Sequence, residues 1–354
     1  MKKTVLLLFG LVATAASANS PYISKVHDFC PAPGQFVNVI PQGASKADVL
    51  ADCEANIAGA ALGEPRPGMI SLGAYGGYVV FSFDHPVVNA PGDYDFKIYG
   101  NSFVQTGTPG IGSSEAGIVM VSVDANHNGL PDDPWYELVG SEHANPLTQR
   151  AFEITYYRTP ADHVAVTDRD HRYASDLQYI RWTSNDPANP EGYLEKNIYH
   201  NQDYWPAWID AETLTFAGTR LRPTVSDTEG VYTQAFFDYG YADNRPNDED
   251  PGLKIDWAVD ADGNPVELKY INFIKVYTAQ NQKSGPLGET STEITGGEDL
   301  HPKLVPAGIS EIVADDLSEE IYTLSGLRVR NTENLPAGVY IRRAPEGFRK
   351  IIIR

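Results

Sequence analysis

The sequence contains few cysteines and comparatively few basic residues. Its 354 residues include two cysteines, Cys30 and Cys53, so a small fold held together by several disulfides is excluded. Lysine and arginine number 27 against 47 aspartates and glutamates, which gives a formal net charge of −20 at pH 7. Because like charges repel, this balance argues against nucleic acid and anionic membranes as partners.

Long apolar runs are also missing, except at the N-terminus. Residues 5–16 are apolar, but the run is too short to cross a bilayer. Lys2 and Lys3 precede it, and the small residues 16–18, Ala-Ser-Ala, form a cleavage site after it. The sequence therefore predicts a signal peptide over residues 1–18, export through the periplasm, and a mature protein without a membrane span.

Helical periodicity is confined to one segment, residues 45–61. It begins with Ser45 and Asp48 in the arrangement of an N-terminal capping box. Apolar residues at i, i+4 and i+8 then share one face. That face carries Val49, Cys53 and Ile57. A helix of this kind would bury Cys53 as a free thiol, whereas an oxidising compartment would allow a disulfide with Cys30, and the sequence leaves both open.

From Gly77 onward the chain is a series of short runs rich in Val, Ile, Tyr, Phe and Trp. Each run is bounded by Gly, Pro, Asn or Asp, which is typical of β-strands. Asp262-Gly263 predicts a tight hairpin turn. We expect an all-β domain over residues 19–300, a β-sandwich of the jelly-roll kind. The expected strands cover 78–83, 94–99, 118–123, 135–140, 152–157, 179–183, 214–221, 235–241, 253–259 and 271–278.

A separate module is expected at the C-terminus. Glycines and prolines mark residues 301–309 as a linker. Residues 310–354 contain three strand candidates, IYTLSGLRVR, NLPAGVYIRR and GFRKIIIR, and end in basic residues on an acidic protein.

Residues 124–133, DANHNGLPDD, form the stretch with the clearest chemistry. Alternating Asp and Asn side chains offer the oxygen ligands that calcium prefers, and Gly129 suits the sharp turn that such a loop needs. An EF-hand is excluded because its twelfth position, which requires Glu, is Trp135. The alternative is a polar turn without an ion.

The stretch is similar to the calcium loops of thrombospondin type-3 repeats and related bacterial loops. The resemblance implies a structural Ca²⁺ with side-chain ligands and one backbone carbonyl. The implied side-chain ligands are Asp124, Asn126, Asn128 and Asp132, with the carbonyl of Leu130, and with Asp133 or Glu137 at the remaining positions.

Residues 199–209, YHNQDYWPAWI, are the densest aromatic stretch of the chain. Aromatic faces stack on sugar rings or on flat cofactors, so the stretch is a candidate ligand platform. The alternative is that it belongs to the core, since Trp and Tyr are buried on average. The candidate ligand-binding residues are Tyr199, His200, Tyr204, Trp205 and Trp208.

No convincing catalytic motif is present. Residues 112–116, GSSEA, approach a nucleophile elbow but lack its last glycine, so a loop serine is favoured. Ser114 and Glu115 could instead contribute oxygens near the calcium loop. The acidic residues 243–250 are expected to be solvated, with a second calcium site as the alternative.

Two resemblances bear on function. The C-terminal module is similar to the sorting domains of proteins exported by the type IX secretion system of Bacteroidetes, which implies the secretion machinery as a partner. It shares Tyr322, Leu324, Gly326, Val329, Leu335, Pro336, Gly338, Tyr340, Ile341 and residues 350–353 with that pattern. The main domain resembles a family of Bacteroidales cell-surface jelly-roll proteins, some encoded near nutrient and cobalamin uptake genes, through GGYVVFSFDHPVVNAPGDYDFKIYGN, EAGIVMVSVDANHNGLPDDPWYELVGSE and YINFIKVYTA.

These observations favour an exported, calcium-stabilised binding protein at the outer cell surface, whose ligand is a glycan or a small nutrient. The alternatives are a glycan-active hydrolase on the same scaffold, an accessory protein of cobalamin uptake, and a structural surface protein. A fold of this kind hosts all of these, so only the site can decide between them.

Overall fold

A computed structural model describes residues 19–59, 68–105, 107–304, 306, 320–323, 328–329, 338–344 and 347–353. The predicted signal peptide lies outside the described residues, as does much of the C-terminal module. The chain divides into two compact units, Met1–Pro306 and Ala307–Arg354, and the division falls within the predicted linker.

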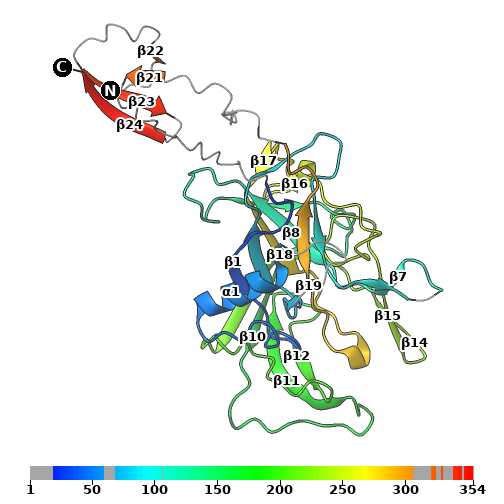
Figure 1. Cartoon of the computed structure of the whole chain (residues 1–354). Helices are drawn as coiled ribbons and strands as arrows, with labels where there is room; N and C mark the ends of the chain where they lie inside the picture. The colour runs from blue at the N-terminus through cyan, green and yellow to red at the C-terminus, as the bar shows by residue number, and fades with distance from the viewer. Residues whose placement is uncertain are drawn as a thin grey trace, which may run out of the picture. The chain divides into compact units, whose positions relative to one another are not determined.

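An antiparallel six-stranded sheet forms the centre of the larger unit (Figure 1). Its middle strands are buried on both faces, which explains why they appear in the sequence as nearly continuous apolar runs. The register places Val276 between Val79 and Val119. The order across the sheet is β1 (Lys25–Cys30), β3 (Tyr78–Ser82), β18 (Phe273–Thr278), β8 (Gly117–Ser122), β9 (Trp135–Leu138) and β16 (Ala258–Val259).

One face of this sheet packs under the helix α1 (Lys46–Ile57) and short paired strands. The predicted capping box is present, because the Ser45 side chain accepts from the Asp48 N–H while the Asp48 side chain accepts from the Ser45 N–H. The paired strands are β5 (Phe96–Tyr99) with β20 (Gly296–Asp299), β2 (Ile70–Ser71) with β19 (Glu293–Ile294), and β4 (Val87–Val88) with β17 (Tyr270–Ile271). The all-β sandwich prediction is confirmed.

The two cysteines are free thiols, so the disulfide alternative is wrong for this structure. Cys53 on α1 is fully buried in the core beneath the helix, whereas Cys30 packs against the aromatic cluster of residues around Tyr156 and Trp205. Burial raises the pKa of Cys53 to about 12, which keeps it protonated and unreactive.

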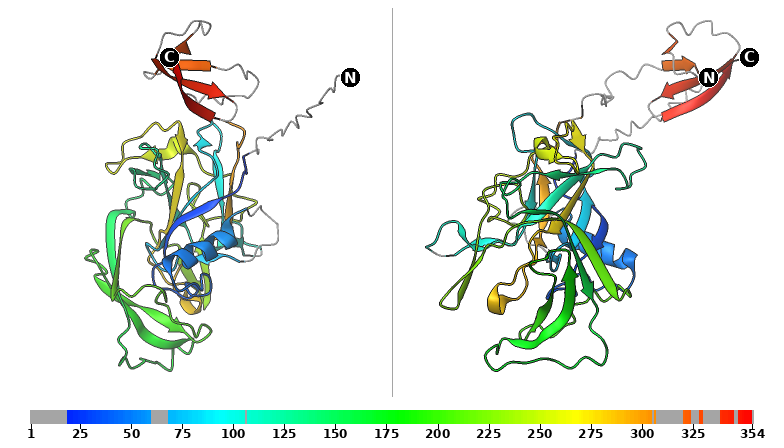
Figure 2. Two further views of the ribbon diagram at one scale, coloured as in Figure 1. Left: turned by 60° about the vertical axis from the view of Figure 1, so that its left-hand side comes forward. Right: turned by 180° about the vertical axis from the view of Figure 1, so that it is seen from behind.

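Two further four-stranded sheets complete the larger unit (Figures 1 and 2). One buries Phe152, Ile154, Tyr156, Ile180 and Phe216 in the aromatic cluster. The other projects from the body, and Figure 1 shows its labelled strands extending away from it. The first has the order β12 (Glu191–Asn197), β11 (Ala174–Ser184), β10 (Gln149–Tyr157) and β13 (Thr213–Arg220), and the second β14 (Val225–Thr228), β15 (Val231–Ala235), β7 (Ile111–Ser113) and β6 (Phe103–Val104).

Some strand predictions fail. Residues 236–241 form no strand, because Gly240 turns the chain at φ +94° while Phe237 and Tyr241 pack into a small core of their own. In the predicted strand 253–259 only Ala258–Val259 pairs in a named strand, after the 3₁₀ turn η1 (Ile255–Trp257). Strand β1, before Gly77, was not predicted. The expected turn at Gly263 is present, with φ +84° and its N–H donated to the carbonyl of Asp260.

The described part of the C-terminal unit is an antiparallel sheet of four strands. Its order is β22 (Arg328–Val329), β21 (Glu320–Thr323), β23 (Gly338–Ala344) and β24 (Gly347–Ile353). Within the described residues, no helix has the length and apolar character required to cross a membrane.

Candidate ligand-binding and cation sites

The Asp/Asn loop, residues 124–133, is exposed and ordered by its own side chains. The Asp124 carboxylate accepts the N–H groups of Asn128 and Gly129 at 3.0 and 2.9 Å. The amide nitrogens of Asn126 and Asn128 donate to Asp132 at 3.0–3.2 Å. Gly129 has φ +73°, in agreement with the expected turn. The four predicted side-chain ligands therefore form one connected group.

The other predicted ligands are placed differently. Asp133 accepts the N–H of Ala125 at 3.0 Å, across the neck of the loop. Leu130 donates its N–H to the side-chain oxygen of Asn128. The prediction of Glu137 as a calcium ligand is wrong. Glu137 lies on β9, accepts the Thr219 hydroxyl at 2.7 Å and lines a separate cavity, so the structure does not bring it to the loop.

The aromatic stretch divides into core and surface. Trp205 is 1% exposed and Tyr204 fully buried, so these two are core residues and not a ligand platform. The hydroxyl of Tyr204 accepts the N–H of Asn197, and the indole N–H of Trp205 donates to the carbonyl of Ile209. Their polar groups are thus satisfied inside the protein, which is why they can be buried.

Trp208 is partly buried against the core and is not part of a platform either. It packs against the cluster beneath α1, with its ring stacked on Phe29 at a centroid distance of 5.9 Å. Of the predicted platform, Tyr199 and His200 line a cavity.

That cavity, which we call the aromatic-rimmed cavity, has a volume of about 470 Å³. Tyr199, Phe103 and Leu287 are 71%, 61% and 69% exposed at its edge. His200 stands edge-on to Phe36 at 4.4 Å between ring centroids. Burial lowers the pKa of His200, so its imidazole is neutral at pH 7. These edge residues are apolar or aromatic, and none of them carries a charge at pH 7.

The cavity wall also contains carboxyl and amide groups. Glu115, Glu289 and Glu293 line it together with the side chains of Gln35 and Gln234. Gln234 is held by accepting the Ser114 N–H at 3.1 Å and donating to the Thr290 hydroxyl at 3.2 Å. Such a combination of an apolar rim with a few placed polar groups is typical of small-molecule sites.

Two of these acids form a buried carboxyl cluster with Asp243. One oxygen from each of Glu115, Asp243 and Glu293 lies within 4.8 Å of the others, and theirs is the single such acidic, His or Cys group among the described residues. The Asp243 carboxylate accepts the N–H groups of Asn101 and Ser102 at 2.8 and 2.9 Å, and its other oxygen accepts the N–H of Glu293 at 2.9 Å.

The backbone at Asp243 is strained. Its φ is +49°, in the left-handed region that a non-glycine residue rarely adopts. The residue is 2% exposed, and its carbonyl accepts the N–H of Glu115 at 3.0 Å. Strain of this kind persists only where surrounding contacts hold it, and it is concentrated at functional sites.

Burial is the main cause that raises the pKa of all three cluster acids. For Asp243 the negative charge of Glu115 raises the pKa further, and for Glu293 both other acids do so. Close carboxyl groups cannot all ionise without a compensating charge, so the cluster holds either protons or a cation near pH 7.

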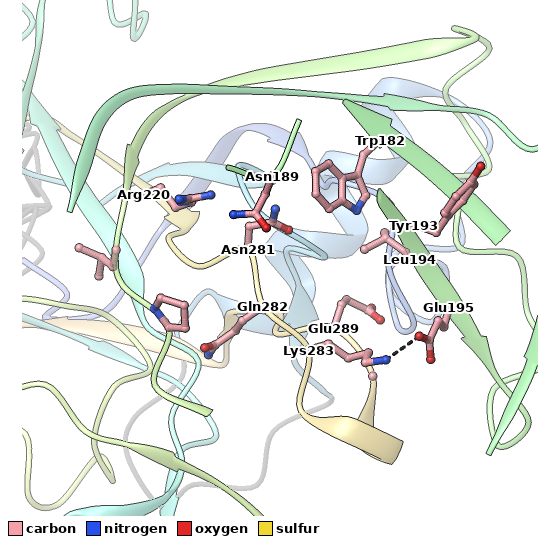
Figure 3. Close-up of a pocket in the computed structure, with 13 residues that line it drawn as sticks. Trp182, Asn189, Tyr193, Leu194, Glu195, Arg220, Asn281, Gln282, Lys283 and Glu289 are labelled. Atoms are coloured by element: carbon pink, nitrogen blue, oxygen red, sulfur yellow. Dashed lines mark hydrogen bonds and ion pairs between the residues drawn. The ribbon is translucent and has the colours of Figure 1, made fainter. Parts of the chain in front are cut away.

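Glu289 lies beside the cluster and is reached from two cavities. Burial raises the pKa of Glu289 to about 7. Its carboxyl oxygens accept the backbone N–H of Gln35 at 2.6 Å and the side-chain amide of Gln35 at 3.1 Å. The second cavity, of about 290 Å³, is shown in Figure 3.

Several polar side chains that line this second cavity are paired with other groups of the protein. Figure 3 shows the ion pair between Lys283 and Glu195, with a distance of 2.5 Å. Arg220 pairs with Asp186 at 2.8 Å. The side-chain oxygen of Gln282 accepts the N–H of Thr224 at 2.8 Å. Because fewer groups are free to meet a ligand, the aromatic-rimmed cavity is the stronger candidate.

The sequence did not reveal this site. Residues 243–250 were expected to be solvated, yet Asp243 and Asn244 are buried. Ser114 is buried and donates its hydroxyl to Asn244 at 3.2 Å, so it is no nucleophile. Glu289 and Glu293 received no prediction. The signal that could have found them is the run GETSTE, residues 288–293, where small polar residues separate two acids without a charge of opposite sign.

No protein-family model matches this chain, and no curated protein is similar enough in sequence to be a relative.

Proposed function

We propose that this protein is an exported cell-surface binding protein that takes a glycan or a small nutrient into the aromatic-rimmed cavity. The observation that carries the proposal is the exposure of Phe103, Tyr199 and Leu287 around a cavity of about 470 Å³. Large apolar side chains exposed together around a hollow are unusual on a soluble domain and mark interaction sites.

The wall of the cavity favours a ligand that donates hydrogen bonds. Glu115, Glu289, Glu293 and Gln35 line the cavity, and their side chains carry acceptor oxygens. Sugar rings combine an apolar face, which stacks on aromatic side chains, with hydroxyl donors. A corrinoid, with amide side chains around a large flat ring, offers the same combination, so the cobalamin-uptake role is one form of this proposal.

The proposal also includes a role for the N-terminal segment in export and for the C-terminal module in sorting to the cell surface. The apolar segment 5–16 with its cleavage site supports export, and the similarity of residues 310–354 to type IX sorting domains supports display at the outer surface. The separate compactness of Ala307–Arg354 supports a removable module. Deleting residues 310–354 should leave the protein in the periplasm, and normal surface levels of the truncated protein would contradict the address.

The Asp/Asn loop supports calcium stabilisation. Asp124, Asn126, Asn128 and Asp132 already contact one another, and turning an Asn amide exchanges its nitrogen for its oxygen. With the oxygens turned inward, the loop offers the ligand type that calcium requires.

The binding role is tested by a calorimetric screen of glycans and corrinoids. For a ligand that binds, Phe103→Ala and Tyr199→Ala should each weaken affinity about tenfold or more, because each removes a stacking face. Leu147→Ala is the matched control, since Leu147 is 62% exposed outside the cavity, and it should leave affinity unchanged. Equal effects of all three variants would refute the cavity as the site.

A glycan-active hydrolase is the second candidate, and the raised pKa values of acids in the cavity wall favour it. Burial raises the pKa of Glu289 to about 7 and also raises that of Glu115, as a general acid at neutral pH requires. Turnover of any screened glycan, lost in Glu289→Gln while binding persists, would replace the binding role by this one.

A further inference from the structure

The buried carboxyl cluster is assembled from three distant parts of the chain. Glu115 precedes β8, Asp243 follows β15, and Glu293 begins β19. Their oxygens lie within 4.8 Å of one another. No lysine or arginine is paired with any of the three in the described part of the chain. Three acids gathered without a basic partner have an unbalanced charge when they ionise.

A second observation at this cluster is a carboxyl oxygen that has no hydrogen-bond partner. Glu293 is 3% exposed, yet its Oε2 has no hydrogen-bond partner among the described residues. Leaving a buried acceptor unsatisfied is destabilising, and more so if the group is charged. Gln35 Oε1, on the wall of the same cavity, is also buried without a partner.

The other two acids keep lone pairs as well. Asp243 Oδ2 accepts a single N–H, from Glu293, while Oδ1 accepts the other two. Glu115 Oε1 accepts the N–H of Ser291 at 3.2 Å, and the Glu115 carboxyl group also forms hydrogen bonds with the side chains of Glu293 and Gln234. A carboxylate oxygen can accept two bonds, so each acid can still direct an oxygen to a common centre.

We propose that Glu115, Asp243 and Glu293 bind a hard divalent cation, of the Ca²⁺ class, at the floor of the aromatic-rimmed cavity. The oxygen-only donor set selects Ca²⁺, Mg²⁺ or Mn²⁺ over metals that prefer nitrogen or sulfur. Glu115 and Glu293 line the cavity, so its water completes the coordination and gives the ion a path of entry. This site is distinct from the Asp/Asn loop and does not depend on the identity of the organic ligand.

The test is calorimetric titration of Ca²⁺ into chelator-stripped mature protein at pH 7.5, with no organic ligand present. Asp124→Ala, which disables the loop, should still bind one equivalent. Asp124→Ala combined with Glu293→Gln should bind none, because the isosteric amide removes the charge and one ligand oxygen. Affinity in the Asp124→Ala background should fall from pH 7.5 to pH 5, since the ion must displace protons.

Glu137→Gln in the same background is the matched control. It neutralises a partly buried acid on β9 that lines a separate cavity, and the protein should still bind one equivalent of Ca²⁺. If Glu293→Gln unfolds the protein, Glu115→Gln takes its place with the same expectation.

Retention of the Ca²⁺ equivalent in the Glu293→Gln and Glu115→Gln variants would overturn the proposal. So would an Asp124→Ala protein that binds no Ca²⁺, Mg²⁺ or Mn²⁺ at pH 7.5, which would show that protons alone hold the cluster. Because the titration contains no sugar or corrinoid, either result leaves the proposed ligand-binding role to its own test.

Discussion

Two oxygen-rich regions of this protein contrast in how they are built. The Asp/Asn loop takes all its side chains from ten consecutive residues and stands in solvent. The buried carboxyl cluster takes Glu115, Asp243 and Glu293 from segments up to 178 residues apart (293 − 115) and holds them in the interior. The loop is visible in the sequence because its geometry is local. The cluster has no local pattern, since its three acids come from three separate segments of the chain.

Solvent makes the two regions energetically different. In the loop, water can replace any hydrogen bond that is lost, and exposed carboxylates repel one another weakly at physiological salt. In the cluster, each lost partner leaves a buried group unsatisfied, and each charge is poorly screened. Similar substitutions should therefore have unequal effects at the two places.

The largest difference is expected between Asp243→Ala and Asp124→Ala without calcium. Asp243→Ala removes the acceptor of three N–H groups, one buried and two partly buried, and should lower the free energy of unfolding by about 3–5 kcal/mol. Asp124→Ala exposes two N–H groups to water and should cost about 1 kcal/mol or less. Urea denaturation with chelator present measures both, and equal losses would remove the distinction between the regions.

The interior acids should also make stability depend on pH. Burial raises the pKa of Glu289 from 4.5 to about 7, so the folded state holds this proton more tightly than the unfolded state. The resulting stabilisation is complete below pH 4.5 and is lost as pH rises through 7, by about 3 kcal/mol. The raised pKa values of Asp243 and Glu293 act in the same direction.

Unfolding measured from pH 4.5 to 8 with chelator present checks this slope. Glu289→Gln should flatten it, whereas a substitution in the loop, Asp132→Asn, should leave it unchanged. If the free energy of unfolding of Glu289→Gln changed with pH as steeply as that of the unmodified protein, the pH dependence would belong to other groups.

Calcium removal should affect both regions to a smaller extent. A ligand at a hundredfold excess over its Kd stabilises the folded state by about 2.7 kcal/mol for each site. Chelation should therefore lower the melting temperature, and Asp124→Ala should abolish the part that belongs to the loop. A melting curve that is identical with and without chelator would contradict cation binding at either place.

The smallest effect is expected from Gly129→Ala in the loop. Gly129 has φ +73° with open space around its Cα, so an added methyl group meets no neighbour but strains the backbone. We expect a loss of about 1 kcal/mol, measured by urea denaturation with chelator present. Gly92→Ala, at φ +84° in a turn without proposed ligands, is the control and should cost the same. A much larger loss at Gly129 alone would show that the loop is held more rigidly than its exposure suggests.

The sequence by itself determined the features that depend on residues close together in the chain. The capping box at Ser45, the buried face of α1, the turn at Gly263 and the all-β character follow from local propensity and periodicity, and the structure agrees. The loop at Asp124 was found for the same reason. In contrast, the aromatic stretch gave a divided result, because composition alone cannot separate an exposed Tyr199 from a buried Trp205 six residues later.

Tertiary structure decided which polar residues are buried together. Asp243 lies in an acidic run that its composition predicts to be solvated. Its side chain is buried instead, because its carboxylate accepts hydrogen bonds from the backbone N–H groups of Asn101, Ser102 and Glu293. Glu115 is held beside Asp243 because its N–H donates to the Asp243 carbonyl, and Glu293 because its N–H donates to the Asp243 carboxylate. Burial and charge proximity are properties of that assembly and not of any single segment, so the cavity floor was determined only when the whole chain had folded.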